Sequence, residues 1–234
     1  MGIENPEIPY EALKQRGFLR QKQEGFFVLR TRMDSGIYTA FQLDAVQKIA
    51  LKYARGMVHA TTRQGLEVPF IRLEDIDSVE RELKAAGVFP GASGPRLRAI
   101  TVCPGNNWCK SGLVNTFNLA KRIESELGIG CGMELPHKFK IAIAGCPNAC
   151  TRPQGSEIGI HGAAAGGYVV YLAGSGGRTP VAGFKLDRIY REDEVLALVK
   201  KVVSFFKEQA RPRQRLAHLV SELGKEAFLN QLGI

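Results

Sequence analysis

The chain has 234 residues, of which 44% are hydrophobic and 24% are charged, and its net charge is +9. This balance is typical of a folded chain with one large or two modest domains, and it excludes a disordered or fibrous protein. No apolar run approaches the roughly 20 residues that span a bilayer, and the N-terminus lacks the basic and apolar regions of a secretory signal. We therefore expect a cytoplasmic protein without membrane contact, whose clustered cysteines stay reduced and bind metal rather than form disulfides.

The excess of basic residues has more than one explanation. Nucleic acid is a possible partner for such a chain, but its lysines and arginines are spread out and form no recognisable nucleic-acid motif. An anionic cofactor, an anionic substrate or an acidic electron donor explains the charge equally well.

The first elements are read from periodicity and capping. Residues 1–24 are polar and are expected to be peripheral. The aromatic and aliphatic run at 25–31 predicts a strand. Thr39 and Gln42 have the spacing of a capping box, and the apolar positions that follow, to residue 53, are at helical spacing.

A second strand and helix follow in the same order. Residues 58–68 alternate loosely and predict a strand, and 76–86 predict an amphipathic helix ended by Gly87. The order strand, helix, strand, helix is the skeleton of a ferredoxin-like unit. The Pro- and Gly-rich segment 90–95 is the best linker candidate, and the pattern restarts after it.

The second half also mixes strands and helices. Residues 97–102 are expected to be extended, 110–127 helical, 139–144 a buried strand, and 156–161 with 168–173 a pair of strands. Two helices are predicted at the end of the chain, over 192–209 and 213–231. The sequence thus predicts an α+β protein in three parts, which are residues 1–90 with an N-terminal extension, 96–190 and 191–234.

Four of the five cysteines form two tight pairs, Cys103 with Cys109 and Cys146 with Cys150. Thiolates that bind iron must be deprotonated and must converge, and the adjacent Pro and Gly residues favour irregular backbone whose N–H groups turn toward sulfur. A zinc site and buried free thiols are the alternatives, but zinc sites more often use two-residue gaps. The spacing favours an iron–sulfur cluster. Cys131 stands outside both pairs and is interpreted as a structural thiol.

A basic segment, 135–140, leads into the second cysteine pair. Lys138 and Lys140 alternate on a predicted strand, so both side chains are expected on one side. With no Asp or Glu nearby in sequence, the two ammonium groups repel each other, and an anion between them relieves this repulsion. A solvated strand face is the alternative. We interpret the pair as an anion site because the strand leads directly to the cysteines.

These motifs resemble those of the sirohaem-dependent nitrite and sulfite reductase family, in particular its low-molecular-mass, single-unit sulfite reductases. The resemblance covers roughly residues 25–175. It implies that the two cysteine pairs bind one [4Fe–4S] cluster and that the last cysteine bridges to the sirohaem iron. The implied cluster ligands are Cys103, Cys109, Cys146 and Cys150, with Cys150 as the bridge.

The resemblance also implies roles for polar residues. The segment 61–64 matches the family's substrate-side motif, and Arg98 resembles a second family arginine. Arginine presents fork-like donors that suit oxyanions and carboxylates. The implied catalytic residues are Arg63, Arg98, Lys138 and Lys140, and the implied sirohaem contacts are Cys150, Arg63, Gln64 and Asn148.

The fold and function implied are an N-terminal ferredoxin-like subdomain, an α+β subdomain over 96–190 that binds both cofactors, and six-electron reduction of sulfite to sulfide. Nitrite is the nearest competing substrate. A non-catalytic sirohaem or electron-transfer subunit and a zinc-binding nucleic-acid module are alternatives from other classes. The chain has no second ferredoxin-type cysteine cluster and no flavin motif, so we expect an external donor such as an acidic ferredoxin or flavodoxin. We expect no nucleic-acid partner, and either a monomer or a homodimer.

Overall fold

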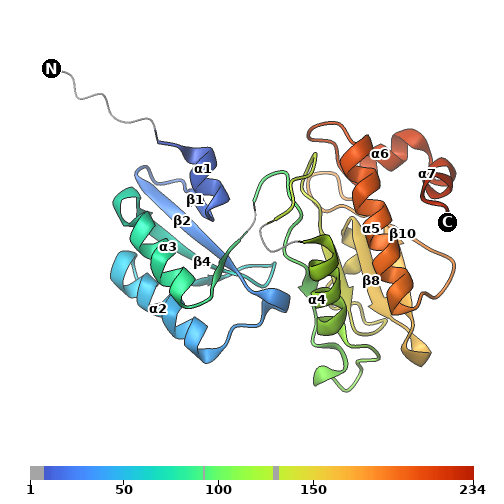
Figure 1. Ribbon diagram of the computed structural model, residues 1–234, viewed down its shortest axis with the longest axis horizontal. Coiled ribbons are helices and arrows are strands. Elements are labelled where there is room, and N and C mark those ends of the chain that lie inside the picture. The colour runs from blue at the N-terminus through green and yellow to red at the C-terminus, as the bar shows by residue number, and fades with distance from the viewer. Residues whose placement is uncertain (1–7, 92, 129–131) are drawn as a thin grey trace. The chain divides into compact units, whose positions relative to one another are not determined.

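The computed structural model describes residues 8–91, 93–128 and 132–234 and divides the chain into two compact units (Figure 1). The first unit comprises residues 1–33 and 37–93, and the second comprises 34–36 and 94–234. Each unit has its own hydrophobic core. Within the described residues, no helix is long and apolar enough to cross a membrane.

The first unit is a five-stranded sheet with helices. Its strands run in the order β1-β2-β4-β3, all antiparallel, and β5 pairs with β2. The elements in chain order are α1 (Tyr10–Gln15), β1 (Phe18–Arg20), β2 (Phe26–Arg32), α2 (Ala40–Tyr53), β3 (His59–Ala60), β4 (Leu66–Arg72), α3 (Ile76–Ala85) and β5 (Phe89–Pro90).

Local sequence explains why the two long helices of this unit form. The Thr39 hydroxyl accepts a hydrogen bond from Gln42 N and the Gln42 side chain accepts one from Thr39 N, so the predicted capping box begins α2. Val46 and Ile49 of α2 are buried in the same core as Val79 of α3. Figure 1 shows α2 and α3 side by side, and this core joins them to β2 and β4.

Two predictions for this unit are wrong. Residues 1–24 are not all peripheral, because Leu13 of α1 and Phe18 of β1 are buried in the core. The single strand predicted over 58–68 is two short strands, β3 and β4, that pair with each other. The residues between them form a turn in which Gln64 has a φ of 61°, a left-handed conformation that a strand cannot contain.

The second unit is a mixed five-stranded sheet in the order β10-β9-β8-β7-β6. The strands β6, β7 and β8 are parallel, and β9 and β10 are antiparallel to their neighbours. The elements are β6 (Thr101–Val102), α4 (Thr116–Leu127), β7 (Ile141–Ala144), β8 (Ile158–Gly162), β9 (Tyr168–Leu172), β10 (Phe184–Lys185), α5 (Glu192–Gln209), α6 (Leu216–Leu223) and α7 (Lys225–Leu232). The α+β architecture is therefore confirmed.

Two predicted helices have different bounds in the structure. The helix predicted over 110–127 begins only at Thr116, because the Asn115 side chain accepts a hydrogen bond from Asn118 N and caps it. The helix predicted over 213–231 is two helices, α6 and α7, separated at Gly224. This residue has a φ of 87°, which a helix does not accommodate.

The C-terminal helices share the core of the second unit. Phe206 of α5 is fully buried and its ring lies 5.2 Å from that of Phe139, which shortly precedes β7. Phe228 of α7 is also fully buried and packs on Phe205 at 5.2 Å. Residues 191–234 are thus part of the packing that holds the strand before the second cysteine pair.

This packing gives a stability prediction. Replacing Phe206 with Ala removes a fully buried ring and leaves a cavity, so the free energy of unfolding should fall by about 3–5 kcal/mol. Phe41→Ala, at a side chain that is 67% exposed, is the matched control and should change it by less than about 1 kcal/mol. Urea denaturation followed by circular dichroism measures both, and equal losses would contradict the packing described here.

Candidate functional site

The two cysteine pairs follow neighbouring parallel strands. Cys103 comes directly after β6, and Cys146 comes two residues after β7. The register pairs Val102 with Ile143, and Cys103 N donates to Ile143 O at 3.2 Å. Because parallel strands end at the same edge of a sheet, both loops begin at one place, which is where open α/β sheets commonly bind ligands.

Glycines let the two cysteine loops approach each other closely. A Cβ added to Gly145 of the second loop would lie 2.5 Å from Gly105 Cα of the first. Within the first loop, one added to Gly112 would lie 2.2 Å from the Gly105 carbonyl carbon. Gly145 N donates to Cys103 Sγ at 3.0 Å, and Leu113 N donates to Gly145 O at 2.8 Å. The two loops are therefore in direct contact, and backbone fills the space where a side chain would separate them.

The four paired cysteines are all free thiols. Cys146 is buried, Cys103 is intermediate, and Cys109 and Cys150 are exposed. Within the described residues, no three Cys, His, Asp or Glu side chains are grouped tightly enough to hold one metal ion. A mononuclear zinc site needs such a group. A [4Fe–4S] cube binds each thiolate at a different iron, so its four thiolates converge on one cluster but lie further apart than the ligands of a single ion.

Three further residues near the cysteines have different outcomes. The position of Trp108 between two paired cysteines predicts that it shields a metal site, but it is 69% exposed, and its ring packs on Phe117 at 5.2 Å. Asn148 is exposed on the loop between Cys146 and Cys150. Cys131 lies outside the described residues.

Arg98, Lys138 and Lys140 share one face of an extended pair upstream of β6 and β7. Leu97 bridges to Phe139 in parallel register, with Arg98 N donating to Phe139 O at 2.9 Å. Leu97 and Phe139 are fully buried, so the residues beside them point to the opposite side. The backbone thus places three of the four predicted anion-binding cations on two neighbouring segments.

The basic face and the cysteines lie toward opposite ends of β7. Five residues of mostly extended chain lie between Lys140 and Cys146, so their Cα atoms are up to about 20 Å apart. A lysine side chain covers only part of that distance. A ligand that contacts both the lysines and the second cysteine pair must therefore be large.

A buried ion pair that sequence reasoning missed lies beside Lys140. Glu157 Oε1 accepts from Arg215 Nε at 2.7 Å, and Glu157 Oε2 accepts from Lys140 N at 2.8 Å. The Glu157 side chain is fully buried and Arg215 is 9% exposed. Burial raises the pKa of Glu157, and Arg215 opposes this rise. Glu157 and Arg215 are 58 residues apart, so no local pattern reveals the pair.

His137 lies within the basic region of the second unit. Burial lowers its pKa, and so do the nearby charges of Arg215, Lys138, Arg98 and Arg213. Its imidazole is therefore neutral near pH 7 and adds no charge to the basic face.

Arg63 and Gln64 lie in the first unit, on the turn between β3 and β4. Thr61 Oγ1 accepts from Arg63 N at 3.3 Å and from Gly65 N at 3.1 Å, which fixes the turn. A Cβ on Gly65 would lie 2.3 Å from Thr31 O, so the turn sits tightly against β2. Arg63 is half-buried and Gln64 is exposed.

Charged residues brace the strands that carry this turn. Glu67 Oε1 accepts from Arg30 Nε at 2.8 Å and Nη2 at 2.6 Å, and Glu67 Oε2 lies 3.2 Å from His59 Nδ1. Burial alone would raise the pKa of Glu67, but the hydrogen bonds from Arg30 and His59 outweigh it and the pKa is lowered.

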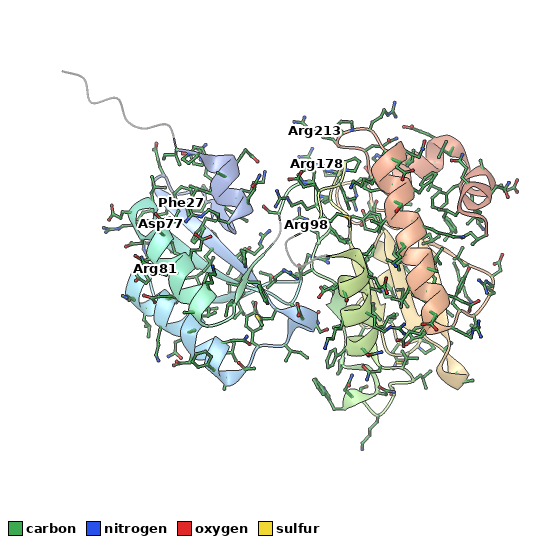
Figure 2. All side chains as sticks on the ribbon, in the orientation of Figure 1. Phe27, Asp77, Arg81, Arg98, Arg178 and Arg213 are labelled. Carbon is green, nitrogen blue, oxygen red and sulfur yellow. The ribbon has the colours of Figure 1, made fainter. Side chains whose placement is uncertain are left out.

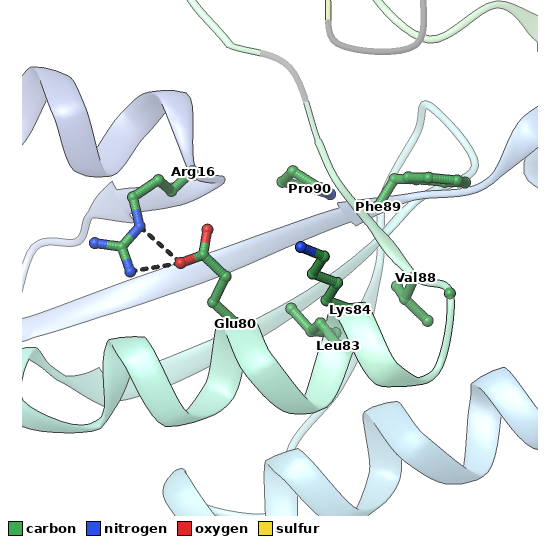
Figure 3. A pocket seen from close by; sticks show the side chains of 8 residues that line it. Arg16, Glu80, Leu83, Lys84, Val88, Phe89 and Pro90 are labelled. Carbon is green, nitrogen blue, oxygen red and sulfur yellow. Dashed lines mark hydrogen bonds and ion pairs between the residues drawn. The ribbon is translucent and has the colours of Figure 1, made fainter.

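A separate, mainly apolar pocket in the first unit contains none of the predicted site residues (Figure 3). Leu83, Val88, Phe89 and Pro90 line it, and Lys84 points across it toward Pro90. Its carboxylate, Glu80, is already hydrogen-bonded by Arg16 Nη2 at 2.6 Å. We assign no chemistry to this pocket.

Family models match both halves of the chain. The nitrite and sulphite reductase 4Fe-4S domain matches residues 93–234, and the nitrite/sulfite reductase ferredoxin-like half domain matches residues 19–86. The chain therefore belongs to the nitrite and sulfite reductase family, whose members carry sirohaem and a [4Fe–4S] cluster. The family resemblance, the ferredoxin-like fold and the cofactor class predicted from sequence are all confirmed.

Individual relatives include both sulfite and nitrite reductases. The chain is 28% identical to coenzyme F420-dependent sulfite reductase of Methanocaldococcus jannaschii, over 92% of this chain and 44% of that protein. It is 26% identical to the assimilatory-type sulfite reductase of Nitratidesulfovibrio vulgaris, over 91% of this chain and 95% of that protein. It is 32% identical to the nitrite reductase [NAD(P)H] large subunit of Klebsiella oxytoca, over 74% of this chain and 18% of that protein.

These relatives differ from the chain in length. The chain spans less than half of the coenzyme F420-dependent sulfite reductase and of the nitrite reductase large subunit. It spans nearly all of the assimilatory-type sulfite reductase. Among solved structures, the NirA protein of Mycobacterium tuberculosis superposes with a TM-score of 0.81 at 20% identity, covering 94% of this chain and 45% of that one. That likeness shows the fold.

The cysteine loops give a prediction for cofactor content. Gly145→Ala places a Cβ against Gly105 Cα and forces the two loops apart, so purified protein should hold much less iron and acid-labile sulfide per chain. Gly155→Ala is the control, because a Cβ there meets nothing within 4 Å. Equal iron content in both variants would show that the loop contact does not hold the cluster.

The brace at Glu67 gives a pH prediction. The pKa of Glu67 is lowered below its ordinary value of 4.5, so its stabilising effect is complete above that pH and is lost as pH falls through the folded-state pKa. At pH 7, Glu67→Gln should lower the free energy of unfolding by about 1 kcal/mol. The difference from wild type should shrink below about pH 4.5. Urea denaturation of both proteins at pH 7, 5 and 4 measures this difference in the free energy of unfolding. A difference that stays constant with pH would show that the ionised Glu67 carboxylate does not stabilise the fold.

Proposed function

We propose that the chain is a sulfite reductase that carries out six-electron reduction of sulfite to sulfide, with sirohaem and a [4Fe–4S] cluster as cofactors. The observation that carries the proposal is the direct contact of the two cysteine loops where β6 and β7 end. The donor set fits the cluster, since four free thiols are presented by loops whose glycines leave room for backbone alone.

Cys103, Cys109, Cys146 and Cys150 would hold the cluster, and the Cys150 thiolate would also face the sirohaem iron. When bound, these cofactors supply electron storage and a site at which sulfur is reduced. The exposure of Cys150 and Asn148 leaves that side of the second loop accessible to a large ligand.

The cationic side chains bind the oxyanion and the carboxylates of the sirohaem. Arg98, Lys138 and Lys140 present donors from one face of the second unit, and the guanidinium of Arg63 and the amide of Gln64 present donors from the first. Lys138 Nζ and Lys140 Nζ hold protons that can be donated as oxygen leaves the substrate as water. Arg63 and Arg98, which do not lose protons, serve to bind and orient.

Nitrite is the second candidate substrate, because the relatives of the chain include nitrite reductases as well as sulfite reductases. We propose that electrons come from a separate acidic donor such as a ferredoxin or flavodoxin, which the net charge of +9 would attract.

A turnover experiment tests this function. The protein, purified without oxygen from cells that make sirohaem, should show the visible spectrum of both cofactors and produce sulfide from sulfite with reduced methyl viologen. Comparing kcat/KM for sulfite and nitrite assigns the preferred substrate. A cofactor spectrum without turnover of either anion would instead support a non-catalytic electron-transfer subunit.

The double variant Lys138→Gln and Lys140→Gln should lower kcat/KM for the preferred anion by about 100-fold or more. Lys185→Gln, at an exposed lysine on β10 at the far edge of the same sheet, is the control and should leave it unchanged. Unchanged turnover in the double variant would remove these lysines from the site.

A further inference from the structure

The connection between α5 and α6, residues 210–215, is hydrogen-bonded to the basic segment 135–140 that precedes β7. Arg213 N donates to Pro136 O at 2.9 Å. Two residues later, Arg215 bonds Glu157, whose second oxygen accepts from Lys140 N. The C-terminal part of the chain thus contacts the lysine segment directly at Pro136, and it is linked to Lys140 through Glu157.

The three arginines of this connection have different surroundings. Arg211 Nη2 bonds both carboxylate oxygens of Glu222 at 2.7 Å, and Arg215 is paired with buried Glu157. No carboxylate in the described ranges pairs with Arg213 or with Lys138. These two cations, with Arg98 and Arg215, lie close enough to His137 to lower its pKa. Figure 2 labels Arg98 and Arg213, both in the second unit.

The backbone at Arg213 is unusual. Its φ is 67°, in the left-handed region that residues other than glycine rarely adopt. Glycine would adopt it more easily, so an arginine here is not explained by the turn itself. Arg213 is one of eight described residues other than glycine with a positive φ, and strained backbone of this kind clusters at binding and catalytic sites.

We propose that Arg213 is an anion-binding residue of the same site as Arg98 and Lys138, and that its guanidinium binds a carboxylate group of the sirohaem or the small oxyanion substrate. This inference rests on the proposed function. It gives the C-terminal segment a role in ligand binding that its packing alone does not require. Arginine suits this role because its planar fork matches a carboxylate or an oxyanion with two parallel hydrogen bonds.

Three variants of the purified holoprotein test the proposal. Arg213→Gln removes the charge. Arg213→Gly removes the charge and also relaxes the backbone. Arg211→Gln is the matched control, because it removes a charge from the same connection at a residue already paired with Glu222.

Two measurements separate the possible ligands. The sirohaem retained per chain after gel filtration at rising salt reports carboxylate binding, and spectral titration with sulfite and with nitrite reports oxyanion binding. We expect both Arg213 variants to weaken either sirohaem binding or oxyanion binding by about five- to twentyfold, while Arg211→Gln matches wild type in both. Arg213→Gly should not lower the melting temperature, which separates lost binding from lost folding.

If both Arg213 variants match Arg211→Gln in retention and in titration, the inference is wrong, whatever the wild-type turnover. If wild-type protein turns over neither anion but its binding still depends on Arg213, the proposed reaction has failed and the binding residue stands. If wild-type protein retains no sirohaem and binds neither anion, both are overturned.

Discussion

The close contact between Gly145 and Gly105 is the constraint on which the cysteine site depends. A Cβ at position 145 would lie only 2.5 Å from Gly105 Cα, so no other residue fits there without separating the loops. Parallel pairing of β6 and β7 brings Cys103 and Gly145 to the same edge, and the glycines then bring the loops into contact. Backbone packing thus brings the loop that carries Cys103 and Cys109 into contact with the loop that carries Cys146 and Cys150.

A second constraint lies at the other end of β7. Glu157 is buried, and an unpaired carboxylate there would be costly, so its bonds to Arg215 and to Lys140 N are needed as a set. Through this carboxylate, the start of α6 and the segment carrying Lys138 hold each other in place. A change in the C-terminal helices therefore reaches the basic face directly.

Much of this could be predicted from sequence, because it depends on local signals. The cysteine spacing, the Thr39 capping box and the periodic helix at 192–209 each depend on residues that are close together in the sequence. The burial of Phe18 and the pairing of Arg215 with Glu157 depend on residues far apart in the chain, and no periodicity shows them. The break at Gln64 was missed because threonines favour strands and the left-handed turn has no glycine at that position.

The separation of the thiols from the cations limits the chemistry that one site can perform. An extended strand lies between Lys140 and Cys146, so a small oxyanion held by the lysines cannot also touch the second cysteine pair. If both groups serve one reaction, as proposed, a large anionic ligand must link them. Sirohaem, which the family carries, has the size and the carboxylates for this, and its charge would offset the repulsion among the cations. The basic face and the cysteine loops are then two ends of one binding surface.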